Sequence, residues 1–143
     1  MFFFIYLLTM NEKNKLISYW LTSAESDLIV AEHLFEKGDY HYCLFIGHLV
    51  LEKTLKALYV KNVDLNPPFK HSLPLLAEKA KLQLTPEQEK FLEEVTDFNI
   101  EARYPDIKFQ FFKKCTKDFT KKYFNEIKEF HQWLKTLIKS NQF

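Results

Sequence analysis

The chain has 143 residues and a net charge of +1, so it is one domain that is long enough to bury a sizeable core. With only two glycines and five prolines, it lacks the turn residues that an all-β fold of this length would need. The near-neutral charge gives no overall electrostatic attraction to nucleic acid or membrane.

The first ten residues, MFFFIYLLTM, form an apolar run. It is about half as long as a membrane-spanning helix, which takes roughly 20 residues. It also lacks the basic region and the cleavage site of a signal peptide. Met10 precedes a polar segment that makes a more natural start. We therefore set residues 1–10 apart as a doubtful extension, expect residues 1–9 not to be translated, and assign residues 11–143 to a single domain. We expect a cytoplasmic protein without membrane contact.

The next segment predicts a helical hairpin. Apolar residues at spacings of three and four predict a helix over residues 12–37, which Gly38 ends. Asp39 is a ready N-cap for a second helix, from Tyr40 to about Lys61. So short a connection predicts an antiparallel pair. Residues 42–51 are apolar nearly all the way round, so the second helix lies at the centre of a bundle or gives one face to a partner subunit.

Two further helices follow a proline-containing loop at residues 66–68. Ser72 caps a short helix, and the sequence of residues 85–88, Thr-Pro-Glu-Gln, predicts a capping box at the start of a helix that runs to about Phe98. Pro105 then biases Tyr104 away from helical backbone.

A last helix is predicted from near Phe111 to about Ser140. Steps of three, four and seven mark its inner face: Phe112, Phe119, Tyr123, Ile127, Phe130, Leu134 and Ile138. No strand pattern is present, so the fold class is all-α, an up-and-down bundle of about five helices.

Neither metal nor cofactor chemistry has a sequence signature. None of the five histidines follows a glutamate by three residues, the spacing of a di-iron bundle site, and two glycines cannot build a phosphate loop. We expect no metal site and no cofactor. Cys43 and Cys115 lie in apolar, helix-like surroundings and are expected to be buried, reduced thiols, with a disulfide between them as the alternative.

The second helix carries the first group of candidate site residues. His48, Glu52 and Lys56 step by four and share one face, with Lys53 beside them. We expect the lysines to belong to a solvated ion-pair stripe. His48 has apolar neighbours, so its ring needs a partner, and a satisfied interior histidine is more common than a catalytic one. His71, just before the cap Ser72, either holds the loop by hydrogen bonds or faces a ligand.

Of the 20 basic residues only one is an arginine, Arg103, between Ala102 and Tyr104. Its planar guanidinium can grip a carboxylate or a phosphate through two bonds, which a lysine cannot do. It marks either an anion site or a loop pinned to the body of the protein. Residues 101–122 contain seven basic side chains and three acids. A solvated helix face is the expected explanation, and a weak footprint for RNA or nucleotide phosphates is the alternative.

Over about residues 15–138 these segments resemble the HEPN family (higher eukaryotes and prokaryotes nucleotide-binding domain). The likeness rests on the order and spacing of four pieces: W-L-x-x-A-x-x-D-L-x-x-A-x-x-L at residues 20–34, the second helix from Gly38 to Leu58, His71-Ser72-Leu73, and Ala102-Arg103-Tyr104-Pro105-Asp106. The resemblance implies a compact helical bundle, usually a homodimer. Many such prokaryotic proteins are encoded beside a minimal nucleotidyltransferase and act with it as a toxin–antitoxin pair.

Many HEPN proteins are metal-independent RNases with an Arg-x4–6-His motif. Here the positions after Arg103 where the histidine would stand are Lys108, Phe109 and Gln110, so the motif is absent. An RNase of this kind needs a histidine as its proton shuttle near neutral pH. The sequence resembles the branch that carries Arg-Tyr-Pro, for which nucleotide or partner binding is the better inference.

Three hypotheses follow. In the first, a non-catalytic or weakly catalytic HEPN protein binds a nucleotide, a nucleotidyltransferase partner, or both. Its candidate ligand-binding residues are Arg103, Tyr104, Asp106, Lys53, Lys56 and Glu52. In the second, an RNase toxin with a diverged site uses His48 or His71 as general acid and base beside Arg103. In the third, the protein is a dimeric structural module in which Arg103 pairs with Asp106 or Glu101.

Overall fold

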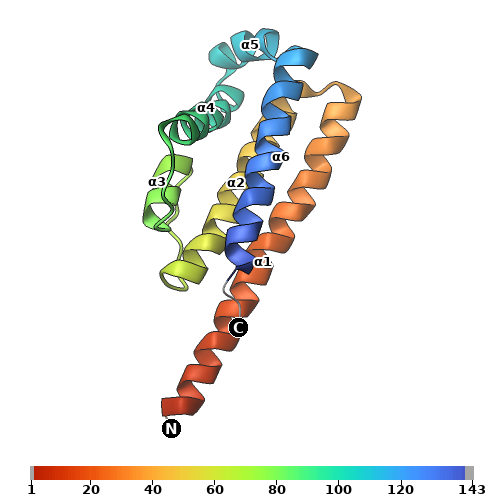
Figure 1. Cartoon of the computed structure of the whole chain (residues 1–143). Helices are drawn as coiled ribbons and strands as arrows, with labels where there is room; N and C mark the ends of the chain where they lie inside the picture. The colour runs from red at the N-terminus through yellow and green to blue at the C-terminus, as the bar shows by residue number, and fades with distance from the viewer. Residues whose placement is uncertain (1, 141–143) are drawn as a thin grey trace.

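A computed structural model of the chain describes residues 2–140, apart from the side chains of residues 105–108. These residues form six helices and no strand: α1 (Phe2–Lys37), α2 (Tyr40–Asn62), α3 (Leu73–Lys79), α4 (Pro86–Arg103), α5 (Pro105–Lys114) and α6 (Lys117–Lys139). The predicted all-α bundle is confirmed. Figure 1 shows α1, α2 and α6 running side by side, with α3 and α4 on the other side of α2 and α5 across one end.

The hairpin of α1 and α2 forms as predicted. Gly38 adopts φ 82°, a conformation that glycine reaches without strain, and its N–H donates to the carbonyl of Phe35. The Asp39 N–H donates to the carbonyl of Leu34, which closes the end of α1. Asp39 occupies the N-cap position of α2, although its side chain makes no capping hydrogen bond. Backbone closure at Gly38 is therefore what turns the chain.

Helix α2 is the central helix, because it packs against α1, α3, α4, α5 and α6. Fifteen of its residues are buried, and its aliphatic core side chains are almost completely so: Leu44, Val50, Leu51, Leu55, Leu58 and Val60. Gly47 has no side chain where α6 crosses, and a Cβ added there would lie 2.8 Å from Cδ1 of Ile127. The central place in the bundle, one of two predicted positions for this helix, is the observed one.

The prediction of one long helix from Phe111 to Ser140 is wrong, because this part of the chain forms two helices, α5 and α6. The chain breaks at Cys115, whose N–H donates to the carbonyl of Phe111 and closes α5, and Thr116 then caps α6. Phe111 is buried, whereas Phe112, predicted to lie on the inner face, is 59% exposed. The periodicity of the two segments is nearly continuous in sequence, which hid the break.

Helix α4 begins as predicted with a capping box formed by Thr85 and Gln88. It runs past the predicted end at Phe98 as far as Arg103, with Asn99 and Ala102 buried against the bundle. Tyr104 then takes extended backbone, with φ −101° and ψ 125°, as expected of a residue before proline. Arg103 is thus the last residue of a helix and not part of a loop.

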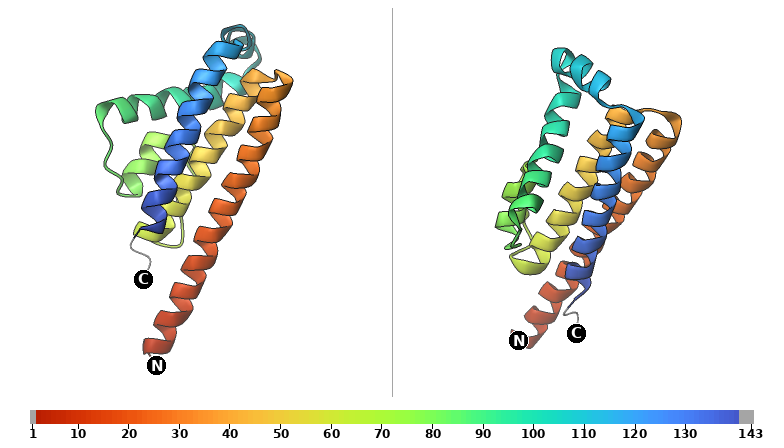
Figure 2. Two further views of the ribbon diagram at one scale, coloured as in Figure 1. Left: turned by 45° about the vertical axis from the view of Figure 1, so that its right-hand side comes forward. Right: turned by 45° about the horizontal axis from the view of Figure 1, so that its top comes forward.

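Residues 2–10 continue α1 as helix beyond the body of the bundle, and Phe2 to Leu8 are exposed (Figure 2). The expectation that residues 1–9 are not translated stays a prediction. Among the described residues, no helix combines the length and the apolar character needed to cross a membrane. Cys43 and Cys115 are free and buried, as predicted, and burial raises the pKa of each thiol to about 12.

Candidate ligand-binding site

His48 lies in the interior, and both of its ring nitrogens have partners. Nε2–H donates to the carbonyl oxygen of His71 at 2.7 Å, and Nδ1 accepts from the side-chain amide of Asn99 at 2.9 Å. These two partners assign the neutral Nε2–H tautomer. Burial lowers the pKa of His48 to about 4. His48 is therefore a satisfied interior histidine, and its ring has no nitrogen free to act as the general acid or base proposed for it.

Glu52 and Lys56 form a second part of the same network. Lys56 Nζ lies 3.2 Å from Glu52 Oε2, and their side chains are only 9% and 7% exposed, respectively. The Lys56 ammonium also lies 5.2 Å from the centroid of the Trp20 ring, where a cation–π contact stabilises it. The expected solvated stripe is therefore wrong for Lys56, because α1 covers this face of α2.

His71 joins the loop before α3 to both parts. Its backbone carbonyl accepts from His48, and its ring Nδ1 lies 2.8 Å from Glu52 Oε1. The ring itself is 57% exposed, and Nε2 has no partner among the described residues. Holding the loop by hydrogen bonds, one of the two roles considered for His71, is thus observed. The exposed side of the ring faces solvent, and contact with a ligand stays a prediction. We refer to His48, Glu52, Lys56, His71 and Asn99 as the His71 cluster.

Arg103 lies one helical turn beyond Asn99, on the α4 side of this cluster. Its positive charge contributes to the lowered pKa of His48, so the two side chains are within electrostatic reach of each other. Arg103 is exposed, and Tyr104 beside it is 57% exposed. No acidic side chain that the structure describes, Glu101 included, forms an ion pair with Arg103. The side chain of Asp106 lies outside the described residues.

Lys53 is separate from this arrangement. Its ammonium lies 2.7 Å from Asp27 Oδ2 on α1, in a half-buried pair that joins the two helices of the hairpin. The structure brings His48, Glu52, Lys56 and His71 together and keeps Lys53 apart. Sequence reasoning missed Asn99, although a polar residue four positions before Arg103, beside the inner stripe of α4, was a signal for it.

The site presents two exposed nitrogen-rich groups, an imidazole oriented by a buried carboxylate and a guanidinium that pairs with no acid among the described side chains. Such groups bind anions, and phosphate oxygens suit the guanidinium fork best. Within the part of the chain that the structure describes, no group of three or more histidine, cysteine or acidic side chains is placed to hold a metal ion.

Comparison with known proteins agrees with this fold. The model of the HEPN domain matches residues 17–137. The crystal structure of TT1696 from Thermus thermophilus is similar, with a TM-score of 0.72 and 17% sequence identity over 84% of this chain and 96% of that one. At this identity the likeness shows the fold alone. The search of curated proteins gave no match.

Proposed function

This chain belongs to the HEPN domain family, and from that premise we propose that it binds a phosphate-bearing nucleotide at the end of α4 and does not depend on catalysis for its role. One observation carries the proposal: Arg103 is exposed, next to the His71 cluster, without an acidic partner among the described side chains. An unpaired guanidinium gains most from a bidentate phosphate, because no existing ion pair has to be broken.

Neighbouring groups support a nucleotide over a simple anion. Tyr104 follows Arg103 and exposes more than half of its surface, so its ring can stack on a base. His71 offers the exposed Nε2 of its ring as a second polar contact. Lys56 and Glu52 are buried, so in this proposal they position His71 and do not contact the ligand themselves. Asp106 remains a candidate contact from its sequence position only.

The family resemblance supplies the proposed partners. We propose a cytoplasmic homodimer that works with a minimal nucleotidyltransferase in a two-gene, toxin–antitoxin-like system. Tyr104, Phe109 and Phe112 expose large apolar surface close to Arg103 in the chain, which suits a protein contact beside the nucleotide. Purification together with the product of the neighbouring gene, followed by analysis of bound nucleotide, tests this part directly.

Arg103→Lys is expected to weaken nucleotide binding by about tenfold, because it keeps the charge and removes the planar fork. The affinity is measured by titrating the purified protein, in whatever oligomeric state it has, with ATP and with GTP. Arg103→Ala is expected to weaken the affinity further. Lys113→Ala serves as the control, since Lys113 is an exposed lysine of the same basic stretch. Equal affinities of wild type, Arg103→Lys and Arg103→Ala would contradict the proposal.

A second candidate function, RNA cleavage, is favoured by one specific observation. The exposed His71 ring is hydrogen-bonded through Nδ1 to a buried carboxylate, an arrangement that orients Nε2 for proton transfer. If wild type cleaves RNA, we expect His71→Ala to lose most of that activity and Glu52→Gln to reduce it. His33→Ala, at an exposed position of α1, is the matched control. Absence of cleavage by wild type would reject this candidate and leave nucleotide binding.

A further inference from the structure

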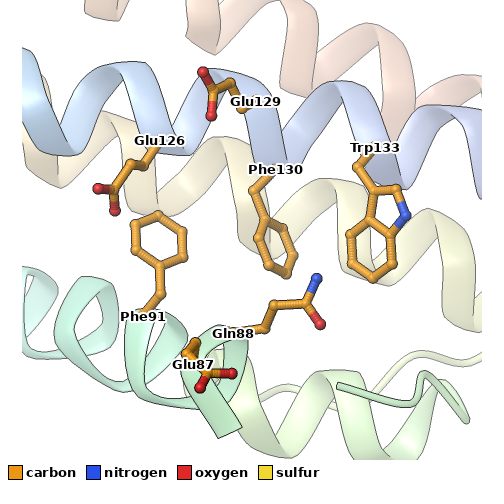
Figure 3. A pocket seen from close by; sticks show the side chains of 7 residues that line it. All are labelled: Glu87, Gln88, Phe91, Glu126, Glu129, Phe130 and Trp133. Atoms are coloured by element: carbon orange, nitrogen blue, oxygen red, sulfur yellow. The ribbon is translucent and has the colours of Figure 1, made fainter. Parts of the chain in front are cut away.

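A pocket lies between the first turns of α4 and the middle of α6, at the opposite end of α4 from Arg103 (Figure 3). Its volume is about 300 Å³, at the lower end of the range for small-molecule sites. Three aromatic and three acidic side chains account for most of its lining: Phe91, Phe130, Trp133, Glu87, Glu126 and Glu129. Among the described residues, no basic side chain lines it.

The aromatic side chains form the floor. Phe130 and Trp133 point from α6 towards α4, and Phe91 points from α4 towards α6 (Figure 3). The Phe91 and Phe130 ring centroids are 5.7 Å apart, and Trp133 meets Phe130 edge to face at 5.2 Å. Phe91 and Trp133 remain partly exposed. Their rings therefore offer apolar surface to an aliphatic chain and π faces to a cation.

The acidic side chains give the pocket its charge. None of the three carboxylates forms an ion pair with a described basic residue, and Lys128, the lysine of α6 nearest to them in sequence, pairs with Glu32 of α1. Glu87 lies in the first turn of α4, where it offsets the partial positive charge of the helix N-terminus. Glu126, beside the Phe91 ring in Figure 3, has no such compensation.

We propose that this pocket binds a small organic cation, an alkylammonium ligand of the linear polyamine class. Its ammonium group pairs with Glu126 and its methylene chain lies over Phe91 and Trp133. A phosphate or carboxylate ligand is disfavoured by the three acids. A bare metal ion is disfavoured because, among the described residues, the carboxylates do not gather into a ligand group. The volume suits a free amine better than the folded segment of a partner protein.

Isothermal titration of the full chain with spermidine, at physiological salt, tests the proposal. We expect saturable binding that Glu126→Gln and Trp133→Leu each weaken by about tenfold. Glu93→Gln, an exposed acid of α4 outside the pocket, removes the same charge and is expected to leave the affinity unchanged. Thermal unfolding of each variant checks that it is folded. If Trp133→Leu does not fold, Glu126→Gln alone still tests the site.

Two further titrations complete the design, with Mg²⁺ alone and with an oligolysine peptide. If both Mg²⁺ and oligolysine bind more weakly than spermidine, the pocket is supported as a site for a free amine. The proposal is overturned if spermidine gives no saturable signal, if Mg²⁺ binds equally well, or if Glu93→Gln weakens binding as much as Glu126→Gln does. Tighter binding of oligolysine would also overturn it, in favour of a basic partner protein.

Discussion

Lowering the pH from 7 to 5 is expected to reduce the free energy of unfolding by about 2 kcal/mol through His48 alone. Burial lowers the pKa of His48 from 6.5 to about 4 in the folded protein. Between these two pH values the His48 ring is protonated in the unfolded chain but stays neutral in the folded protein, so acid favours unfolding. Well above pH 6.5 the ring is neutral in both states and the full stability is present. Urea unfolding at a series of pH values measures the effect.

A substitution separates His48 from the other histidines. His48→Gln is expected to be less stable at pH 7, because it disturbs the hydrogen bonds to Asn99 and the His71 carbonyl, but to lose less stability on acidification. His33→Ala, at an exposed position, is expected to keep the wild-type slope. Burial also lowers the pKa of His131, which adds to the acid sensitivity and remains in His48→Gln. Identical pH slopes in wild type and His48→Gln would contradict the assignment.

The helical bundle could be predicted because its signals are local. Gly38 ends α1, and the sequence of residues 85–88 contains a complete capping box, so both features were readable without any tertiary information. The apolar run within residues 42–51 likewise indicated that α2 is buried on several sides, as it is. The family resemblance rested in part on the second of these helices, from Gly38 to Leu58, and on short motifs elsewhere that are also local. Fold and family were therefore both predicted correctly.

The remaining features depend on contacts between segments far apart in sequence. Lys56 looked like a solvated lysine on α2, and only the packing of Trp20 from α1 shows why it is buried. The bond between His48 and the His71 carbonyl spans 23 residues, and the one from Asn99 spans 51. No periodicity records such pairings. The sequence did show that the His48 ring needs a partner, but not which partners it has.

The end of α4 was missed for a different reason. The predicted end near Phe98 followed the last apolar residue of the inner stripe, whereas proline restricts only the residue before it and permits helix up to Arg103. Proline is also favoured in the first turn of a new helix, and α5 begins at Pro105. Because Arg103 ends a helix that is anchored by buried Asn99 and Ala102, its backbone is held in place by the bundle.

Gly47→Leu is expected to destabilise the protein by about 3 kcal/mol, because α2 and α6 meet too closely at this point to admit a side chain. A Cβ alone would lie 2.8 Å from Cδ1 and 3.6 Å from Cγ2 of Ile127, and the remaining atoms of leucine would extend into the fully buried seam of α6. Gly47→Ala is a milder step. Its Cβ meets only the end of the Ile127 side chain, which can rotate, and alanine gains about 1 kcal/mol of helix propensity over glycine. We therefore expect its unfolding free energy to stay within about 1 kcal/mol of wild type.

A double-mutant cycle with Ile127→Ala tests whether the overlap itself is responsible. Ile127→Ala alone should cost about 2–5 kcal/mol, since it leaves a cavity at a fully buried position. In the double variant the leucine at position 47 fills part of that space, so the combined loss should be smaller than the sum of the two single losses. Urea unfolding of the four proteins measures the coupling. Additive losses would mean that Gly47 is required for a reason other than its contact with Ile127, such as the approach of a neighbouring helix backbone. A favourable coupling would identify this contact as the one that sets the distance between α2 and α6.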